Sequence, residues 1–295
     1  MEPDLLVAVL GATGRQGGAV ARHLLGDGWR VRALTRRPNS EPARRLARAG
    51  ADVVRADMAD AASLRAAFRG AYGVFNVQNP MTGGGVETEV RHGKRVADMA
   101  SELGVRHLVY GSAGTGVPGT GVPEWESKLA VQAHMETLGL PITVLRPTAF
   151  MELMSDRAFF PPVSTWHLMP KLMGTDRRIP WLGVDDLGAV AARAFADPEL
   201  FIGRELRLAG DLASIAECRA LWTEVMGRSP RPIPMPVWMF ERFVSTDLTT
   251  MWRWLRTGLV EADPAVTRSI VPTVATVKEW LVKFRDGAMA TRRRR

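Results

Sequence analysis

The 295-residue sequence predicts an α/β protein, in which a doubly wound parallel sheet is followed by a smaller C-terminal α/β substrate lobe. Two observations predict this fold class. In the first half of the chain, short β-rich runs alternate with helical patterns, which is typical of a parallel sheet covered by helices on both faces. The first run, residues 5–11, is continuously apolar, as expected for a strand buried on both faces.

The alternation of strands and helices continues to residue 147. The β-rich runs predict strands at residues 5–11, 29–36, 51–57, 72–78, 106–113 and 141–147. Apolar residues at helical spacing predict helices at residues 17–28, 40–50, 61–70, 87–104 and 128–139. Glycine ends several of these helices, and Ser40 is placed to cap the second one. The first half therefore consists of successive β–α units around one sheet.

The later half of the chain is less regular. Helices are expected at residues 184–198 and 214–227, and a strand at residues 204–210. Residues 159–183 and 231–258 are rich in Pro, Met and Trp and show little periodicity. Such side chains suit a pocket for a flat apolar ligand, although simple core packing also explains them.

These patterns divide the chain into three parts. We expect an NADP(H)-binding core over residues 1–155, for the reasons given below. Residues 156–288 are expected to form a mixed region, a substrate lobe from which some strands and helices return to the core. The basic tail, residues 289–295, is expected to be disordered.

Composition limits the possible classes of function. No apolar run reaches the roughly 18–20 residues of a membrane span, and the N-terminal apolar run is typical of a first strand and not of a signal peptide. The single cysteine, Cys218, excludes an intrachain disulfide, suits a reducing cytosol, and is expected to pack on a helix. No histidine pair has metal-ligand spacing, so we expect no metal site and a cytoplasmic protein without membrane contact.

The formal net charge of +8 does not indicate specific nucleic-acid binding. Four of these charges are the terminal residues Arg292 to Arg295, and most other arginines lie on predicted helix faces. There is no basic stripe interleaved with aromatic residues and no recognition motif. Net charge alone indicates a tendency to non-specific association and gives no information about the fold.

A glycine pattern follows the first predicted strand. Gly11, Gly14 and Gly17 form Gly-x-x-Gly-x-x-Gly between a buried strand and a helix. Glycine permits a tight turn and close approach of the backbone to a pyrophosphate, and the helix N-terminus offers free N–H groups. In this strand–turn–helix position the motif predicts a Rossmann-type dinucleotide site.

The end of the second predicted strand indicates which dinucleotide is bound. An acidic residue there would bind the adenosine ribose of NAD, but Thr35 takes its place. Arg36 and Arg37 follow with guanidinium groups suited to a 2′-phosphate, which predicts NADP(H), unless both are merely solvated loop charges. Asp57 and Met58, after the third strand, are placed to meet the adenine, although Asp57 could instead cap the next turn.

Several segments together resemble a known family. The runs "GATGRQGG", "TRRP", "VVRADMAD", "LRPTAFMELM", "WLGVDDLGAVAARAF" and "VATVKEWL" recur in order as in the NmrA-like group of atypical short-chain dehydrogenases/reductases. The resemblance covers nearly the whole chain and implies a Rossmann fold with a C-terminal lobe, binding NADP(H). Members of the group are either cofactor-sensing regulators or reductases that act on quinones or aryl ethers.

The resemblance also implies roles for individual residues. The pyrophosphate turn would be Gly11, Thr13, Gly14, Arg15, Gln16 and Gly17, and Arg36 would meet the 2′-phosphate. Asn76, Val77 and Gln78 would lie beneath a ribose, Lys128 would hold the nicotinamide ribose, and Pro147, Thr148 and Phe150 would pass the nicotinamide. Ser112 matches the substrate-orienting serine.

The catalytic tyrosine of a short-chain reductase has no counterpart. Its position, four residues before Lys128, holds Glu124, which we expect in a loop. The only two tyrosines, Tyr72 and Tyr110, cannot take the role by spacing, and Tyr110 is expected to pack inside a strand. Lys128 could hold the ribose only, or could also act as a general base if desolvated. His167, in the irregular segment, is a second candidate for a proton donor.

Two functions remain open at this point. The first is an NADPH-dependent oxidoreductase that reduces a flat apolar carbonyl, quinone or enone without the usual tyrosine. The second is an NADPH-sensing redox regulator that has no turnover and acts through a protein partner. A small apolar or aromatic substrate is expected for the first, and a homodimer or a regulatory partner is compatible with either.

Overall fold

The computed structural model describes residues 5–79, 84–258 and 260–293, which form two compact units. The first unit holds Met1–Pro118, Pro123–Arg146 and Leu187–Leu206. The second unit holds Gly119–Val122, Pro147–Asp186 and Arg207–Arg295. The chain therefore passes between the units several times, and residues distant in sequence complete each of them.

The first unit is built on a seven-stranded sheet with the order β3-β2-β1-β4-β5-β6-β9. These strands are β1 (Leu6–Val9), β2 (Arg30–Thr35), β3 (Asp52–Arg55), β4 (Gly73–Asn76), β5 (His107–Gly111), β6 (Ile142–Pro147) and β9 (Glu205–Leu208). Neighbours among the first six strands pair in parallel. Because β1 lies between β2 and β4, the strand order reverses there, and open α/β sheets bind ligands at such a point.

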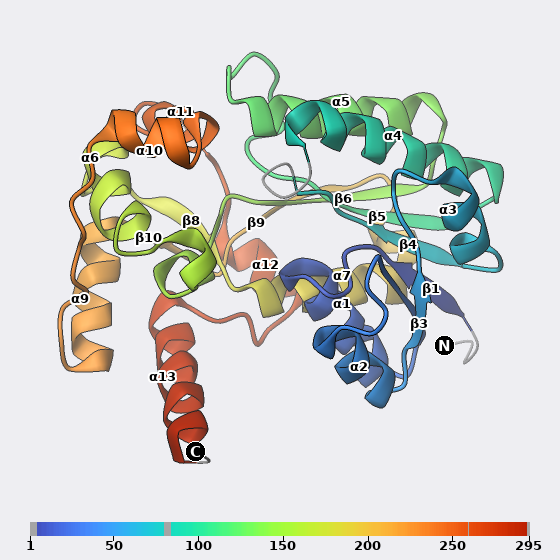
Figure 1. The fold of residues 1–295 in the computed structure, drawn as a ribbon, viewed down its shortest axis with the longest axis horizontal. Coiled ribbons are helices and arrows are strands. Elements are labelled where there is room, and N and C mark those ends of the chain that lie inside the picture. The colour runs from blue at the N-terminus through green and yellow to red at the C-terminus, as the bar shows by residue number, and fades with distance from the viewer. Residues whose placement is uncertain (1–4, 80–83, 259, 294–295) are drawn as a thin grey trace. The chain divides into compact units, whose positions relative to one another are not determined.

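Helices cover both faces of this sheet, so the predicted doubly wound, Rossmann-type fold is confirmed. They are α1 (Arg15–Gly26), α2 (Glu41–Arg48), α3 (Ala61–Phe68), α4 (Gly85–Glu102), α5 (Pro123–Thr137), α7 (Val184–Ala196) and α8 (Pro198–Phe201). Helices α3, α4 and α5 lie on one face, and α1, α2 and α7 lie on the other (Figure 1). A continuous cluster of buried apolar residues joins β1, β4 and β5 to α3, α4 and α5.

The sequence explains why α4 and α5 pack closely. The buried side of helix α4 includes the small residues Gly93, Ala97 and Ala100. A Cβ atom at Gly93 would overlap Val131 of α5, so only glycine allows this approach. The close packing brings buried side chains of the two helices together.

The second unit contains a three-stranded sheet with the order β10-β8-β7. Its strands are β7 (Ala149–Phe150), β8 (Ile179–Leu182) and β10 (Asp211–Ala213). Its α-helices are α6 (Met169–Met173), α9 (Ile215–Met226), α10 (Val237–Phe243), α11 (Thr246–Trp254), α12 (Pro264–Ile270) and α13 (Val277–Arg293). Ser214 and Glu217 form a reciprocal capping box that fixes the start of α9. Cys218 is buried on α9, as predicted.

Three local predictions need correction. Helix α5 begins at Pro123, five residues before the expected start, so Glu124 lies in a helix and not in a loop. Residues 159–183 are not irregular throughout, because they contain a π-helix at Ser164–Leu168, α6 and β8. Their periodicity is hidden because most of these side chains are buried.

Two smaller differences concern helix ends. Ser40 precedes α2, but its side chain makes no capping hydrogen bond. Helix α13 continues to Arg293, into the segment 289–295 that we expected to be disordered, and residues 294 and 295 lie outside the described residues. Among the described helices, none is both long and apolar enough to cross a bilayer.

Candidate cofactor site and its buried lysine

The glycine pattern forms a tight turn between β1 and α1. Gly11 has a φ of +60°, and its carbonyl oxygen accepts a hydrogen bond from Gly14 N at 2.8 Å. A Cβ atom at Gly17 would overlap the carbonyl oxygens of Leu10 and Gly11. Gly14, at the N-cap of α1, makes no side-chain capping hydrogen bond, and a helix N-terminus favours an anion.

The carboxyl ends of β1, β4 and β5 converge beside this turn. A Cβ atom at Gly11 would lie 3.3 Å from Val77 Cγ1. A Cβ atom at Gly111, which ends β5, would lie 3.2 Å from both Gln16 Oε1 and Val77 Cγ2. The structure therefore brings three predicted cofactor residues, Gly11, Gln16 and Val77, together at the switch point of the sheet.

Three polar atoms at this edge are buried and have no hydrogen-bond partner among the described residues. They are Gln16 Oε1, Asn76 Nδ2 and Gln78 Oε1. The other ends of the last two side chains are paired, because Gln78 Nε2 donates to Asn76 Oδ1. Buried polar groups are nearly always hydrogen-bonded in native proteins, so these atoms fit a ligand that offers both donors and acceptors.

The end of β2 is held close to the glycine turn. Thr13 Oγ1 lies 3.4 Å from Thr35 Oγ1, and Thr35 Oγ1 also accepts from Arg37 N at 3.1 Å. Arg36 and Arg37 follow directly and are exposed to solvent. The strand thus ends with a neutral hydroxyl where an acidic residue would repel a 2′-phosphate, and with two exposed guanidinium groups.

The residues after β3 have structural partners. Asp57 Oδ1 accepts from Ala59 N at 2.9 Å, which is the turn-capping role considered above for this carboxylate. Met58 O accepts from Arg95 Nη1 at 2.9 Å. Their proposed contact with an adenine remains a prediction. Burial, followed by Arg91 and Arg95, lowers the pKa of His92 on α4, while Asp57 raises it and Arg36 lowers it, so charges of both signs lie near this helix.

Lys128 lies in α5 and is buried, with 5% of its surface exposed. Its Nζ donates to Glu89 Oε1 at 2.5 Å and to Gln78 O at 2.9 Å. The side chain of Glu89, on α4, has no exposed surface, and its other oxygen accepts from Ser127 Oγ at 2.5 Å. Sequence reasoning missed Glu89, which lies on the buried side of α4 with Gly93.

Tyr110 packs beneath this lysine, as predicted. It is completely buried, its hydroxyl donates to Lys128 O at 3.5 Å, and its ring centre lies 5.8 Å from Lys128 Nζ. Burial, and then the Glu89 carboxylate, raises the pKa of Tyr110 well above that of a free tyrosine. The phenol therefore stays protonated inside the core.

Ser112 lies just after β5 and is 2% exposed. Its hydroxyl oxygen accepts from Arg146 Nη1 at 2.9 Å, and Arg146 forms an ion pair with Glu205 at 2.5 Å. Because a hydroxyl can accept and donate at once, Ser112 keeps its own proton for a further hydrogen bond. This arrangement is compatible with its predicted role in orienting a substrate.

The remaining predicted residues belong to the second unit. Pro147 is the last residue of β6, Thr148 follows it, and Phe150 ends β7. His167 lies in the π-helix and is half-buried, next to the buried Trp166. Their proposed roles, beside the nicotinamide and as a proton donor, remain predictions.

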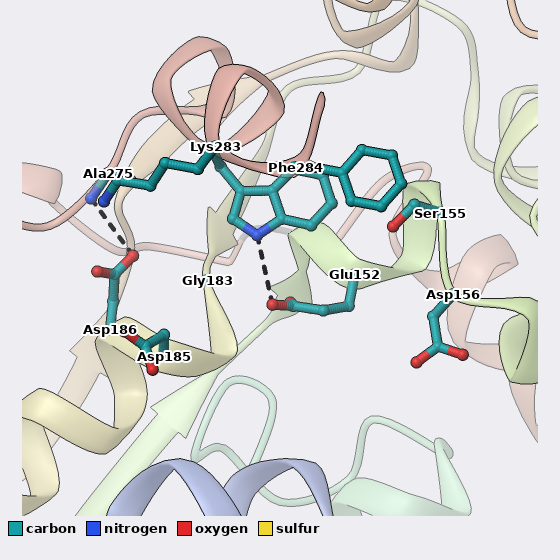
Figure 2. A pocket seen from close by; sticks show the side chains of 10 residues that line it. Glu152, Ser155, Asp156, Gly183, Asp185, Asp186, Ala275, Lys283 and Phe284 are labelled. Atoms are coloured by element: carbon teal, nitrogen blue, oxygen red, sulfur yellow. Dashed lines mark hydrogen bonds between the residues drawn. The ribbon is translucent and has the colours of Figure 1, made fainter. Parts of the chain in front are cut away.

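The second unit has a pocket of about 490 Å³. Figure 2 shows Glu152, Asp156, Asp185 and Asp186 around it, with Phe284 on the α13 side. Glu152 accepts hydrogen bonds from Val184 N at 3.2 Å and Trp280 Nε1 at 3.4 Å, and Asp186 Oδ2 accepts from Ala275 N at 3.3 Å. Two of the four carboxylates thus hold the local backbone. The lining also includes Lys283, so carboxylates outnumber cations there and disfavour an anionic cofactor.

Comparison with known proteins identifies the family. The model of the NmrA-like family matches residues 3–281. The chain belongs to this family. Among NmrA-like relatives, the oxidoreductase FrzB of Cladobotryum sp. is 34% identical over 259 residues, covering 79% of this chain and 77% of that protein. The oxidoreductase lnaB of Aspergillus flavus is 30% identical over 265 residues, covering 81% and 78%.

Solved structures confirm the NmrA-like fold. NmrA, a negative transcriptional regulator solved in complex with NADP, superposes with a TM-score of 0.76 at 20% identity, covering 95% of both chains. The triphenylmethane reductase of Citrobacter sp., solved with NADP(H), gives a TM-score of 0.74 at 19% identity, covering 95% of this chain and 99% of that one. At these identities the likeness shows the fold.

Proposed function

We propose that this NmrA-like chain binds NADP(H) at the carboxyl edge of the first sheet and is an NADPH-dependent reductase. The observation that carries the proposal is the end of β2, where Thr35 contacts Thr13 of the glycine turn and exposed Arg36 and Arg37 follow. A neutral residue at the acid's position, with guanidinium donors beside it, favours a 2′-phosphate. The lone buried Cys218 suits the cytosol as its location.

The residues of the first unit fit such a cofactor. The backbone of the turn from Gly11 to Gly17 and the start of α1 would hold the pyrophosphate. The buried unpaired atoms of Asn76 and Gln78 would meet a ribose or the nicotinamide amide. Lys128 would hold ribose hydroxyls. The nicotinamide, when bound, supplies a hydride.

The substrate class rests on the lack of the usual tyrosine acid. Tyr110 is sealed in the core, so its phenol cannot reach a substrate. A quinone or enone that receives a hydride becomes a stabilised oxyanion, which water protonates easily, so a strong positioned acid matters less. We therefore propose a flat apolar carbonyl, quinone or enone as substrate, with Ser112 as its orienting donor.

A second candidate is supported by the surroundings of Lys128. Its ammonium is tied to Glu89 and to the Gln78 carbonyl, which suits a fixed cation better than a group that moves protons. A protein in which NADP(H) is held without turnover would be a redox-sensing regulator that acts through a protein partner. The solved relative NmrA is itself a transcriptional regulator.

One experiment separates the candidates. NADPH binding is measured by calorimetry, and NADPH oxidation is followed by absorbance with a panel of quinones, enones and aromatic aldehydes. The reductase proposal expects binding together with saturable oxidation by at least one compound. Tight binding without turnover on the whole panel would favour the regulator, and absence of NADPH binding would overturn both proposals.

A further inference from the structure

The contacts of Lys128 leave its ammonium group with one N–H to spare. An ammonium has three N–H donors. Two of them are used inside the first unit, on Glu89 Oε1 and on the backbone oxygen of Gln78. Because Gln78 lies just after β4, at the edge where unpaired polar atoms gather, the third donor is available close to the proposed cofactor.

Glu89 supplies the charge that keeps Lys128 in this position. A buried ammonium is costly unless it is paired and hydrogen-bonded. The side chains of Lys128 and Glu89 are 7% and 0% exposed, so water contributes little to their solvation. Ser127 Oγ donates to Glu89 Oε2, which fixes the orientation of the carboxylate from its second oxygen.

The other groups around Lys128 do not replace Glu89. From β5, Tyr110 presents its ring, and burial and then Glu89 raise its pKa, so it remains neutral. Arg146 of β6 lowers the pKa of Tyr110. It is a cation, however, and is itself paired with Glu205. From the end of β4, Gln78 offers a neutral carbonyl. Of these groups, only Glu89 brings negative charge to the lysine.

We propose that Glu89 is a positioning residue for Lys128. It holds Nζ against the Gln78 carbonyl and directs the remaining N–H to the ribose hydroxyls of a bound nicotinamide cofactor. The inference rests on the proposed function, and it gives α4 a part in the cofactor site that no motif in the sequence indicates.

The test is a double-mutant cycle with NADPH affinity as its readout. Glu89→Gln keeps the size of the side chain and removes its charge, whereas Lys128→Met removes the donor. We expect each single variant to raise the NADPH dissociation constant roughly tenfold. Because Glu89 acts through Lys128, the double variant should bind within about twofold of Lys128→Met. Losses that multiply in the double variant would overturn the inference.

Two further measurements exclude a merely structural role. Glu87→Gln changes an exposed carboxylate on the same helix and should leave NADPH affinity unchanged. Glu89→Asp keeps the negative charge, so it should recover part of the NADPH affinity that Glu89→Gln loses. An equal loss of NADPH affinity in Glu89→Asp and Glu89→Gln would mean that the charge of Glu89 plays no part, against our proposal.

The design keeps the inference and the proposed function separable. If Glu89→Gln does not fold, the double variant and Lys128→Met still test the idea; the double variant leaves neither buried charge, whereas Lys128→Met leaves the Glu89 carboxylate without its cation. If the double variant then bound NADPH about tenfold more weakly than Lys128→Met, the inference would be overturned. If the wild type fails to bind NADPH, the proposed function is refuted instead. If the wild type binds NADPH but the affinity losses of the two single variants multiply in the double variant, only the role of Glu89 is refuted.

Discussion

At the scale of single residues, the strongest prediction concerns Arg36. A charge-assisted contact between a guanidinium and a phosphate contributes about 1.5–3 kcal/mol. We therefore expect Arg36→Ala to weaken NADPH binding roughly ten- to a hundredfold, measured by calorimetry, and to leave NADH binding nearly unchanged.

Arg37 offers a matched control for Arg36, because it is also exposed and lies one residue farther from β2. Arg37→Ala should cost less NADPH affinity than Arg36→Ala. An equal loss of NADPH and NADH in Arg36→Ala would show that this arginine does not recognise the 2′-phosphate.

A second prediction at this scale concerns the stability of the first unit against acid. Burial lowers the pKa of His107 to about 4. Its Nε2 lies 2.8 Å from Thr143 Oγ1, which itself donates to Phe201 O, so His107 Nε2 must carry the donated proton. The imidazole is therefore neutral in the folded protein, whereas in the unfolded chain it takes up a proton near pH 6.5.

The direction of the pH effect follows from this difference. The unfolded state binds more protons than the folded state between about pH 6.5 and 4, so the free energy of unfolding falls as pH falls through this window. His107 should account for about 2 kcal/mol of the loss between pH 7 and 5. In urea denaturation, the free energy of unfolding of His107→Gln should fall correspondingly less between about pH 7 and 5. A wild type and a variant with the same pH slope would contradict the assignment.

At the scale of elements, the glycine turn before α1 gives a prediction. Gly14 has an extended backbone, with φ −92°, which a larger residue can adopt, but a Cβ there would lie 3.1 Å from Gly11 O. We expect Gly14→Val to fold, as judged by circular dichroism, and to lose binding of both NADPH and NADH by at least roughly a hundredfold, because the branched side chain blocks the anion site.

Gly26, at the other end of the same helix, is the control, since a Cβ there meets nothing within 4 Å. Gly26→Ala should keep cofactor affinity and stabilise the helix slightly. If Gly14→Val still bound NADPH normally, the turn would be structural only.

The elements also show where sequence reasoning succeeds and fails. Strands β1 to β6 were predictable because each is a short β-rich run set between helical patterns. The start of α5 was not, because Glu124 follows the Gly- and Pro-rich run at residues 114–123 and was expected in a loop, although an acidic residue in a first turn is favourable. Glu89 was missed because a single helix cannot show that its partner, Lys128, approaches from another helix.

At the scale of the whole molecule, the same contrast separates the two units. The first unit repeats one local unit, a strand followed by a helix, which the sequence displays directly. The sheet of the second unit joins segments far apart in the chain, since Trp181 pairs with both Ala149 and Asp211. Strands of two to four residues carry too little periodicity to be recognised before their partners are known.

The choice between reductase and regulator is a property of the whole molecule, and Lys128 provides its test. If the ammonium only holds ribose hydroxyls, Lys128→Met should raise the NADPH concentration needed for half-maximal turnover roughly tenfold, and saturating NADPH should restore most of the rate. Its ties to Glu89 and Gln78 lead us to expect this result. The measurement is steady-state NADPH oxidation with the best substrate of the panel, beside calorimetric NADPH binding. A variant that binds NADPH normally and shows no turnover would instead make Lys128 the group that moves the proton.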